Sequence, residues 1–301
     1  MAIADRVYWL HAITPLHVGA GRGNGYIDLP IIREKVTGFP FVPGSSTKGV
    51  FADFNQATDD ARDPGKPEGV YRKLVHAAFG RAGDDTANSG ALSFTDARLV
   101  CLPVRSLYGT FAWCTCPMIL QRLKRDLELT GVENLDDVGS LTNQAHNPVG
   151  STVLLQGGKA YIEDLDITVQ GCNIAAGWAK TISEFVFADL AWREIFKERF
   201  LVLPDNVFAF LAETGTEVQA HICIDPDYKR VKNGALWYEE SLPAESILAG
   251  LVQCAGPYGV TGVSKAEVLS LLDHDQVLQM GGKATTGKGQ VRMMFRKGAD
   301  T

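Results

Sequence analysis

The chain contains the segment Thr14-Pro-Leu-His-Val-Gly-Ala-Gly21 near its start and Gly281-Gly-Lys-Ala-Thr-Thr-Gly-Lys-Gly289 near its end. A third segment, Pro43-Gly-Ser-Ser-Thr-Lys-Gly49, follows soon after the first. Glycine allows a backbone to approach a ligand closely, and small hydroxyl groups and lysine are suited to binding phosphate. Together, these segments predict one composite surface for a polyanion.

The overall charge sets a limit on this prediction. The net charge is −6, and hydrophobic residues make up 46% of the chain, which is typical of a folded protein. An acidic balance argues against a protein that coats nucleic acid in general, because phosphate binding needs a basic surplus. Residues 281–301 nevertheless gather five cations, at Lys283, Lys288, Arg292, Arg296 and Lys297. The counts therefore predict a local basic groove on an acidic protein.

Neither a membrane nor a structural metal is predicted. The sequence has no uninterrupted apolar run of about 18 residues and no signal-peptide pattern at its start, so we expect a cytoplasmic protein. Cys114-Thr-Cys116 lacks the second cysteine pair of a zinc site. Its flanking apolar residues indicate ordinary buried thiols.

The pattern of apolar residues predicts an α+β fold with an antiparallel sheet. Strands are expected over Arg6 to Thr14, Val207 to Ala212 and Gln290 to Arg296, and a helix is expected to begin with Ser45 or Ser46 as its cap. Strands and helices do not alternate regularly, which argues against a doubly wound sheet. A βαββαβ core with long insertions fits this order.

Residues 217–240 are predicted to form a projecting hairpin. Pro226 and Asn233-Gly234 are turn formers between two strand-like segments. Basic and aromatic side chains follow along the hairpin at Lys229, Arg230, Lys232, Trp237 and Tyr238. Such a hairpin can wedge between bases. The alternative is a hairpin that packs on its own sheet.

The glycine-rich segment 281–289 comes close to a P-loop. Gly282, Gly287 and Lys288 fit the pattern G-x-x-x-x-G-K, but Gly289 replaces the Ser or Thr that binds magnesium. A strand-like segment follows where a P-loop requires a helix. An NTPase is therefore disfavoured, whereas a backbone nest for a phosphate remains compatible with the segment.

Asp28 and His17 are the candidate chemical groups. Both lie in the glycine-rich and proline-rich region 15–43, which is predicted to be a long functional loop. A carboxylate beside a phosphodiester can bind a divalent cation or orient a 2′-hydroxyl, and a histidine can carry a proton. The alternative is that Asp28 caps a turn and His17 has no catalytic role.

In their order and wording, these segments resemble the RAMP-superfamily backbone subunit of type III-B CRISPR effectors, the fourth subunit of the Cmr module. The phrases Ile27-Asp-Leu-Pro-Ile-Ile-Arg-Glu34 and Leu236-Trp-Tyr-Glu-Glu-Ser-Leu-Pro243 carry most of the resemblance. It implies a single RAMP domain over residues 1–301, with a ferredoxin-like, RRM-related palm. It also implies a β-hairpin thumb at approximately 217–240 and an active-site loop region at 15–43.

The resemblance also implies a function. Copies stack head to tail along a CRISPR guide RNA, together with the other Cmr-module subunits. They cut complementary target RNA at regular intervals, using magnesium or manganese. The family's cutting and metal-binding aspartate matches Asp28, and its loop neighbour matches His17. The RNA contacts match Arg33, Ser45, Ser46, Lys48, Gly282, Lys283, Thr285 and Lys288.

Two other functions remain open from the sequence. In one, the chain is a structural RNA-binding filament subunit in which Asp28 has no catalytic role. In the other, it is a related ribonuclease that processes guide precursors. Cleavage of a complementary target in the presence of metal separates the first alternative from the guided nuclease, and activity of the isolated monomer on repeat RNA would indicate the second.

Overall fold

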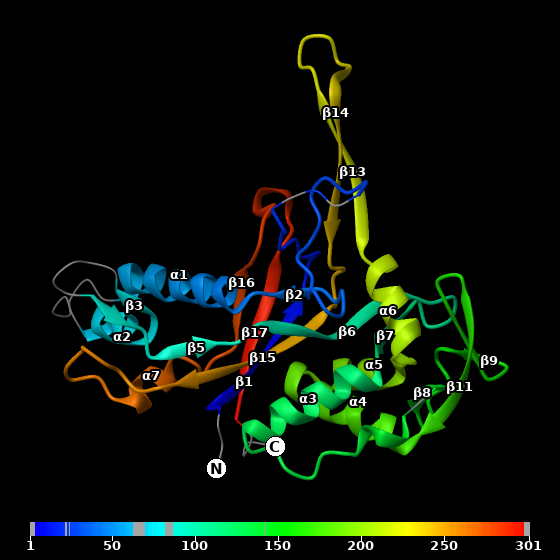
Figure 1. Cartoon of the computed structure of the whole chain (residues 1–301), viewed down its shortest axis with the longest axis horizontal. Helices are drawn as coiled ribbons and strands as arrows, with labels where there is room; N and C mark the ends of the chain where they lie inside the picture. The colour runs from blue at the N-terminus through cyan, green and yellow to red at the C-terminus, as the bar shows by residue number, and fades with distance from the viewer. Residues whose placement is uncertain are drawn as a thin grey trace.

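One long mixed sheet runs through the protein in this computed structural model, which describes residues 4–21, 23, 25–62, 70–81, 87–141 and 143–297 (Figure 1). Arg22 and Asn24, within the loop region 15–43, lie outside the described residues. The strands of the sheet are β1 (Arg6–Ala12), β2 (Phe41–Val42), β5 (Leu92–Phe94), β6 (Ala97–Arg105), β7 (Phe111–Thr115), β8 (Ala145–Pro148), β9 (Leu155–Gln156), β10 (Lys159–Ile162), β11 (Leu165–Cys172), β12 (Phe200–Val202), β15 (Ile247–Cys254), β16 (Gln276–Gln279) and β17 (Gln290–Arg296). Their order is β16-β17-β1-β15-β6-β7-β12-β8-β11-β10-β9, with β2 beside β6 and β5 beside β15.

The centre of the sheet is a ferredoxin-like unit. Strands β17, β1, β15 and β6 are neighbours in that order, and all of their pairings are antiparallel. Helices α1 (Gly44–Arg62) and α2 (Val70–Phe79) lie between β1 and β6 in the chain, and α7 (Lys265–Ser270) lies between β15 and β17. This is the split βαββαβ arrangement. The predicted α+β fold is therefore confirmed.

Both faces of the central strand β1 are covered. Alternate β1 side chains point to opposite faces, so Tyr8 and Leu10 join one core cluster and Val7 and Trp9 join another. The first cluster packs against α1, α2 and α7. The second packs against α3 (Pro117–Leu129), α4 (Asn173–Val186) and α5 (Leu190–Glu198), where Trp9 stacks on Phe185 with ring centroids 5.5 Å apart. Every residue of β1 is buried, so the strand shows no alternation of polar and apolar residues.

Two of the predicted elements differ from the structure. Residues 207–212 lie in helix α6 (Asp205–Thr214), not in a strand. Phe208, Leu211 and Ala212 are buried at helical spacing, so the apolar run fits both periods and its length alone did not decide between them. Helix α1 begins at Gly44, whose amide donates to the Asp96 carboxylate over 2.8 Å. The cap therefore comes from a distant loop and not from a serine.

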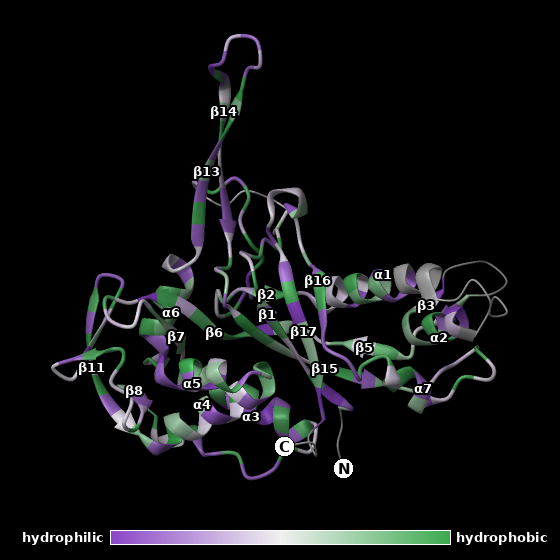
Figure 2. Cartoon of the chain, turned by 180° about the vertical axis from the view of Figure 1, so that it is seen from behind, coloured by the Kyte–Doolittle hydropathy of each residue, from purple (hydrophilic) through white to green (hydrophobic). Residues whose placement is uncertain are grey.

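A two-stranded hairpin projects from the body of the protein (Figure 1). It consists of β13 (Glu217–Ile224) and β14 (Val231–Ser241), paired in antiparallel register from Glu217–Ser241 to Ile224–Val231 with a bulge near Cys223. Figure 2 shows hydrophobic and hydrophilic residues interspersed along it. A second small pair, β3 (Gly80–Arg81) and β4 (Asn88–Ser89), lies beside α2, and short 3₁₀ turns occur at Val138–Ser140 and Ala284–Thr286.

Cys114 and Cys116 are buried and free, and burial raises the pKa of both thiols. Among the described residues, no helix is both long and apolar enough to cross a membrane.

The two glycine-rich ends of the chain lie side by side. The Gly289 amide donates to the Pro15 carbonyl and the Gly282 amide to the His17 carbonyl, each over 2.9 Å. Gly281 has a φ of +72°, and a Cβ at this position would lie 2.2 Å from the His17 carbonyl oxygen. Segments 14–21 and 281–289 therefore form one surface, as the sequence predicts.

The close approach at Gly281 generates a stability prediction. Gly281→Ala should lower the free energy of unfolding by clearly more than the roughly 1–2 kcal/mol that a left-handed backbone costs a residue with a Cβ. Gly287→Ala is the matched control, because Gly287 has a φ of +83° but no atom within 4 Å of an added Cβ. Denaturant unfolding of both variants measures the difference. Equal losses would show that the contact with His17 does not restrict position 281.

Candidate active site

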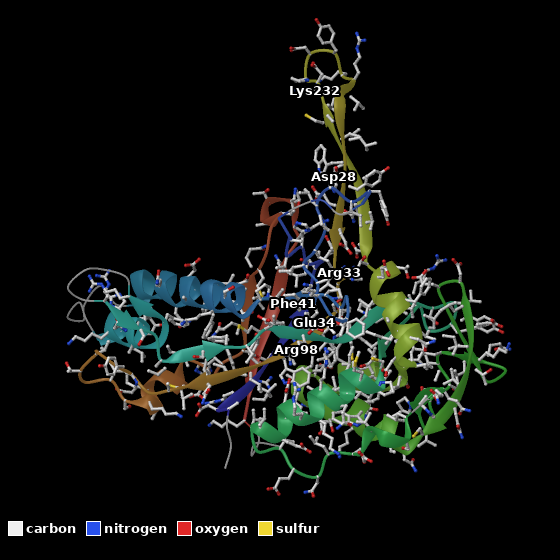
Figure 3. The ribbon with its side chains drawn as sticks, viewed as in Figure 1. Asp28, Arg33, Glu34, Phe41, Arg98 and Lys232 are labelled. Atoms are coloured by element: carbon white, nitrogen blue, oxygen red, sulfur yellow. The ribbon has the colours of Figure 1, made fainter. Side chains whose placement is uncertain are left out.

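The carboxylate of Asp28 is fixed at the root of the hairpin (Figure 3). Its Oδ2 accepts a hydrogen bond of 2.8 Å from the Tyr238 amide of β14. The next residue, Leu29, donates its amide to the Tyr238 carbonyl over 3.1 Å and accepts the Glu240 amide over 3.0 Å. Asp28 itself is exposed, and its Oδ1 has no hydrogen bond to any described residue. The loop therefore presents one free carboxylate oxygen to solvent.

His17 is part of the same junction but is buried. Only 6% of its surface is exposed, and its Nδ1 lies 2.6 Å from the Glu240 carbonyl oxygen. Because a carbonyl only accepts, Nδ1 must be the protonated nitrogen. No hydrogen bond between His17 and Asp28 is found in the described part of the chain. The structure thus brings both predicted residues to β14 without pairing them.

The Glu240 side chain anchors the N-terminal loop to β14. Its carboxylate is almost fully buried and accepts hydrogen bonds from the Ile31 amide over 3.0 Å and the Thr216 hydroxyl over 2.9 Å, and it forms an ion pair with Arg33. Arg33 also donates to the carbonyls of Gly38 and Ala212, each over 2.9 Å. This predicted RNA contact is therefore engaged with protein atoms.

The neighbouring Glu239 holds the C-terminal loop. Its buried carboxylate accepts hydrogen bonds from Lys283 Nζ over 2.6 Å and from Trp237 Nε1 over 2.7 Å. Burial favours a raised pKa for Glu239, but these two hydrogen bonds and the nearby His221 hold the pKa below its ordinary value. His221 also stacks on Trp237, with ring centroids 5.7 Å apart. Lys283 and Trp237 thus contribute to the framework of the hairpin root.

The other residues of the C-terminal loop that were predicted to contact RNA are partly buried and partly exposed. Lys288 is 7% exposed, and its Nζ donates to the Ser241 hydroxyl over 3.1 Å. Gly282 and Thr285 are exposed. Of the predicted contacts in this loop, those two are open to a ligand, while Lys283 and Lys288 have protein partners.

The start of α1 offers groups without protein partners. Ser45 and Ser46 are exposed in its first turn, where the helix dipole favours an anion, and their side chains have no hydrogen bond to another described residue. The Gly44 amide of this turn is already bonded to the Asp96 carboxylate, and the Thr47 amide to the Pro43 carbonyl. Lys48 is half-buried, and no hydrogen bond or ion pair links it to another described residue. Burial lowers the pKa of Lys48. An incoming phosphate would supply the countercharge that the protein does not.

The basic residues of the hairpin lie near its tip, where Tyr228 accompanies them, whereas Trp237 and Tyr238 lie at its root. Lys229, Arg230 and Lys232 are exposed near the tip, and the Arg230 guanidinium lies 5.3 Å from the centre of the Tyr228 ring. Figure 3 shows Lys232 far from Asp28 along the hairpin. Tyr238 lies at the root instead, edge-on to the exposed Tyr26 with centroids 6.5 Å apart.

The described residues contain no cluster of three or more His, Cys, Asp or Glu that could bind a metal. Asp28 is a single carboxylate ligand. A hard divalent cation such as Mg²⁺ is often bound by one or two carboxylates plus substrate phosphates. The free Oδ1 of Asp28 fits that mode, in which nucleic acid supplies the other ligands.

Comparison with known proteins places this architecture in a family. The model of the RAMP superfamily matches residues 9–292. The chain belongs to the RAMP superfamily. Among RAMP proteins, it is 33% identical to the CRISPR system Cmr endoribonuclease Cmr4 of Pyrococcus furiosus, over 96% of this chain and 94% of that relative.

Solved RAMP structures share the whole fold. An oligomeric Cmr4 from Pyrococcus furiosus superimposes with a TM-score of 0.75 at 26% identity, covering 99% of this chain and 100% of the other. A chain of a type III-B Cmr-beta complex bound to cognate target RNA gives a TM-score of 0.72 at 21% identity over 96% of both chains. At 21% identity, the similarity to the chain of the Cmr-beta complex shows a shared fold alone.

Sequence reasoning missed the anchoring role of Glu239 and Glu240. Both were recognised only as parts of an aromatic strand. The sequence did contain a signal for this role: two adjacent carboxylates occur in a strand that is expected to be partly buried. Buried carboxylates need partners, so this pattern indicates ion pairs or hydrogen bonds. Those partners, Arg33 and Lys283, are distant in sequence, so the pairing was not visible.

The buried ion pair generates a second prediction. Arg33→Ala should lower the free energy of unfolding by about 3 kcal/mol or more, because it leaves the Glu240 charge buried without its cation. Arg33→Ala combined with Glu240→Gln should recover part of this loss. Arg105→Ala is the control, because Arg105 is exposed and its side chain has no partner among the described residues. Denaturant unfolding is the measurement, and similar stabilities for Arg33→Ala and Arg105→Ala would contradict the anchoring role.

Proposed function

We propose that this chain is the repeating backbone subunit of a type III-B CRISPR effector and that its 15–43 loop cuts target RNA. Copies of the chain assemble head to tail on a guide RNA with other Cmr-module subunits. The observation that carries the proposal is the Asp28 carboxylate, held rigidly on β14 with one oxygen free. The names of the relatives, an endoribonuclease and an oligomeric Cmr4, support it.

The chemistry needs little from the protein because RNA carries its own nucleophile. The 2′-oxygen forms a bond to the adjacent phosphorus while the bond from phosphorus to the 5′-oxygen breaks. This leaves a cyclic phosphate and a 5′-hydroxyl. Asp28 Oδ1 takes the proton of the 2′-hydroxyl, and solvent returns a proton to the leaving oxygen. Holding the 2′-oxygen in line with the phosphorus supplies much of the rate.

Asp28 is also the residue that would hold a divalent cation. Magnesium or manganese, when bound, would neutralise charge on the phosphate that is being cut. Only Oδ1 is free, because Oδ2 is engaged by the Tyr238 amide, so binding the cation and taking the 2′-hydroxyl proton are alternative roles of this one oxygen. His17 acts as a positioning residue: its Nδ1 contact with Glu240 fixes the loop that carries Asp28.

Guide RNA is proposed to cross the surface between α1 and the C-terminal loop. Ser45, Ser46 and Lys48 bind one phosphate at the start of α1. Gly282 and Thr285 offer a second contact in the exposed loop. The basic tip of the hairpin adds charge farther along the strand. This local arrangement suits an acidic protein, because it attracts RNA in one groove only.

The competing function is a structural filament subunit. The Asp28–Tyr238 hydrogen bond favours it to some degree, because the carboxylate already has a structural role. In that case, Asp28 would contribute to the loop and not to cleavage. The two functions differ in what a charge-neutral replacement does.

A third prediction separates these functions. Asp28→Asn keeps an oxygen acceptor for the Tyr238 amide, so assembly and RNA binding should be unchanged. Cleavage should fall by about 10²- to 10⁴-fold, because the proton acceptor and charge are lost. The assay uses the complex assembled with guide RNA and labelled complementary RNA, resolved on a denaturing gel with magnesium or manganese. Removing the metal with EDTA should stop cleavage in the wild type and leave binding intact.

Asp28→Ala is the matched comparison. It removes the acceptor as well as the charge, so it should also loosen the loop. Evenly spaced products from the wild type and none from Asp28→Asn would support guided cleavage. Wild-type cutting by Asp28→Asn would exclude the catalytic role of Asp28.

A fourth prediction concerns the guide. Lys48→Ala should weaken guide binding equally for different sequences and reduce the slope of log affinity against log salt by about 0.7, the value for one phosphate of a single strand. Lys180→Ala on α4 is the control, since Lys180 is exposed and far from α1 in the fold. Fluorescence anisotropy at several salt concentrations measures both. An unchanged slope for Lys48→Ala would remove this residue from the guide contacts.

A further inference from the structure

A cavity of about 630 Å³ lies between α5 and the ends of β1, β16 and β17. Its lining includes His11, Phe187, Trp192, Glu245 and Arg292. None of the residues proposed for cleavage or guide binding lines it. The volume is in the range of a small-molecule site. The cavity is therefore a second candidate site, and it shares no lining residue with the first.

One wall of the cavity is a continuous aromatic stack. Trp192 lies parallel to Phe187, with centroids 6.0 Å apart and an interplanar angle of 11°. Phe187 in turn packs edge-on against His11 at 5.3 Å. Trp192 is 44% exposed although one of its faces is covered by Phe187. A large part of the indole is therefore exposed at the cavity.

Beside His11, the cavity offers one acceptor and one donor. Glu245 Oε2 lies 2.7 Å from His11 Nε2, while Oε1 has no hydrogen bond to any described residue. Arg292 is the cross-strand neighbour of His11 and has neither an ion pair nor a hydrogen bond through its side chain in the described ranges. The cavity therefore contains a free carboxylate oxygen and a free guanidinium.

The other two carboxylates at the cavity have protein partners. Asp189 Oδ1 accepts the amides of Ala191 and Trp192 as the cap of α5, whereas its Oδ2 has no hydrogen bond to any described residue. Asp275 forms a two-point ion pair with Arg296, at 2.6 and 2.9 Å. The charged groups available to a ligand are thus Glu245 Oε1, Asp189 Oδ2 and Arg292.

The backbone of Glu245 is strained, which is unusual for this residue type. Its φ is +72°, in the left-handed region that glycine occupies readily. The Trp113 indole N–H donates to its carbonyl over 2.9 Å, and its amide donates to the Ala12 carbonyl over 2.7 Å. Strained backbone conformations of this kind are concentrated at functional sites, where the need for a particular side chain outweighs the conformational cost.

We propose that this cavity binds an unstacked nucleobase of single-stranded RNA. The base stacks on Trp192, donates to Glu245 Oε1 and accepts from Arg292. Aromatic stacking with hydrogen bonds to base edges is how proteins bind unpaired RNA bases. An acidic ligand would meet Glu245, and a basic side chain would meet Arg292. A neutral planar ring with both donors and acceptors satisfies both groups.

The experiment uses the full-length protein and free AMP, followed by saturation-transfer NMR. AMP should bind through its base, and Trp192→Ala should weaken binding by about tenfold or more, whereas Trp192→Phe should retain most of it. Glu245→Gly should weaken binding without lowering the melting temperature, because glycine relieves the backbone strain. Leu190→Ala is the control: Leu190 is 72% exposed near the cavity but does not line it.

Several outcomes would overturn the proposal. Equal binding of ribose 5-phosphate would indicate an anion site, and binding of N-acetylarginine amide in place of AMP would indicate a site for a partner protein's arginine. Unchanged AMP binding in Trp192→Ala, or loss of AMP binding in Lys48→Ala, would place the nucleotide elsewhere. A fully stable Glu245→Gly that binds AMP normally would remove Glu245 from the site. None of these readouts depends on target cleavage, so the cavity and the Asp28 loop can fail separately.

Discussion

Strand β14 is hydrogen-bonded along both of its edges at the root of the hairpin, and the candidate active site depends on this double pairing. One edge pairs with β13. The other edge, from Tyr238 to Leu242 just past the end of β14, pairs with Leu16 and Leu29 through backbone groups. The side chains of His17 and Asp28 bond to the same edge. An unpaired edge would be open to other chains. Here the same hydrogen bonds close the edge and order a loop rich in glycine.

The two carboxylates at this root work on opposite faces of the strand. Glu239 and Glu240 are consecutive, so their side chains point to opposite sides of β14. Glu239 binds Lys283 of the C-terminal loop, and Glu240 binds Arg33 of the N-terminal loop. A shift of register by one residue would exchange these partners and break both pairs. The charges therefore specify the register of the hairpin as well as its stability.

This arrangement also explains how an acidic chain can present a small basic surface. Lys283 and Lys288 contribute to the hairpin root, so their charges are largely used within the protein. Lys48 at the start of α1 and the hairpin tip remain without carboxylate partners in the described part of the chain. Positive potential is thus confined to a few positions. Counting the basic residues of segment 281–301 overstates the charge available to RNA.

The sequence was informative where a signal is local. Strand β17 was predicted from alternation, and the hairpin from its turn formers and flanking strands. The turn lies at residues 225–230, which include Pro226, whereas Asn233-Gly234 falls inside β14, so the turn predicted there was wrong. Residues 207–212 were wrongly predicted as a strand because a short apolar run fits both periods, although Pro204 and Asp205 at its start are typical of a helix N-terminus. The cavity beside α5 could not be predicted at all. Its groups come from five separate segments, and only the fold brings Trp192, Glu245 and Arg292 together.

The segment that follows β14 connects the two sites. Leu242 pairs with Leu16 through two hydrogen bonds, and the Glu245 amide donates to the Ala12 carbonyl. Segments 12–17 and 240–245 therefore lie side by side, with Glu240 facing the Asp28 loop and Glu245 facing the cavity. Because these backbone hydrogen bonds join the two segments at both ends, they restrict the spacing between the loop and the cavity. An RNA strand that placed one nucleotide in the cavity would have its neighbours held in a constant register relative to Asp28.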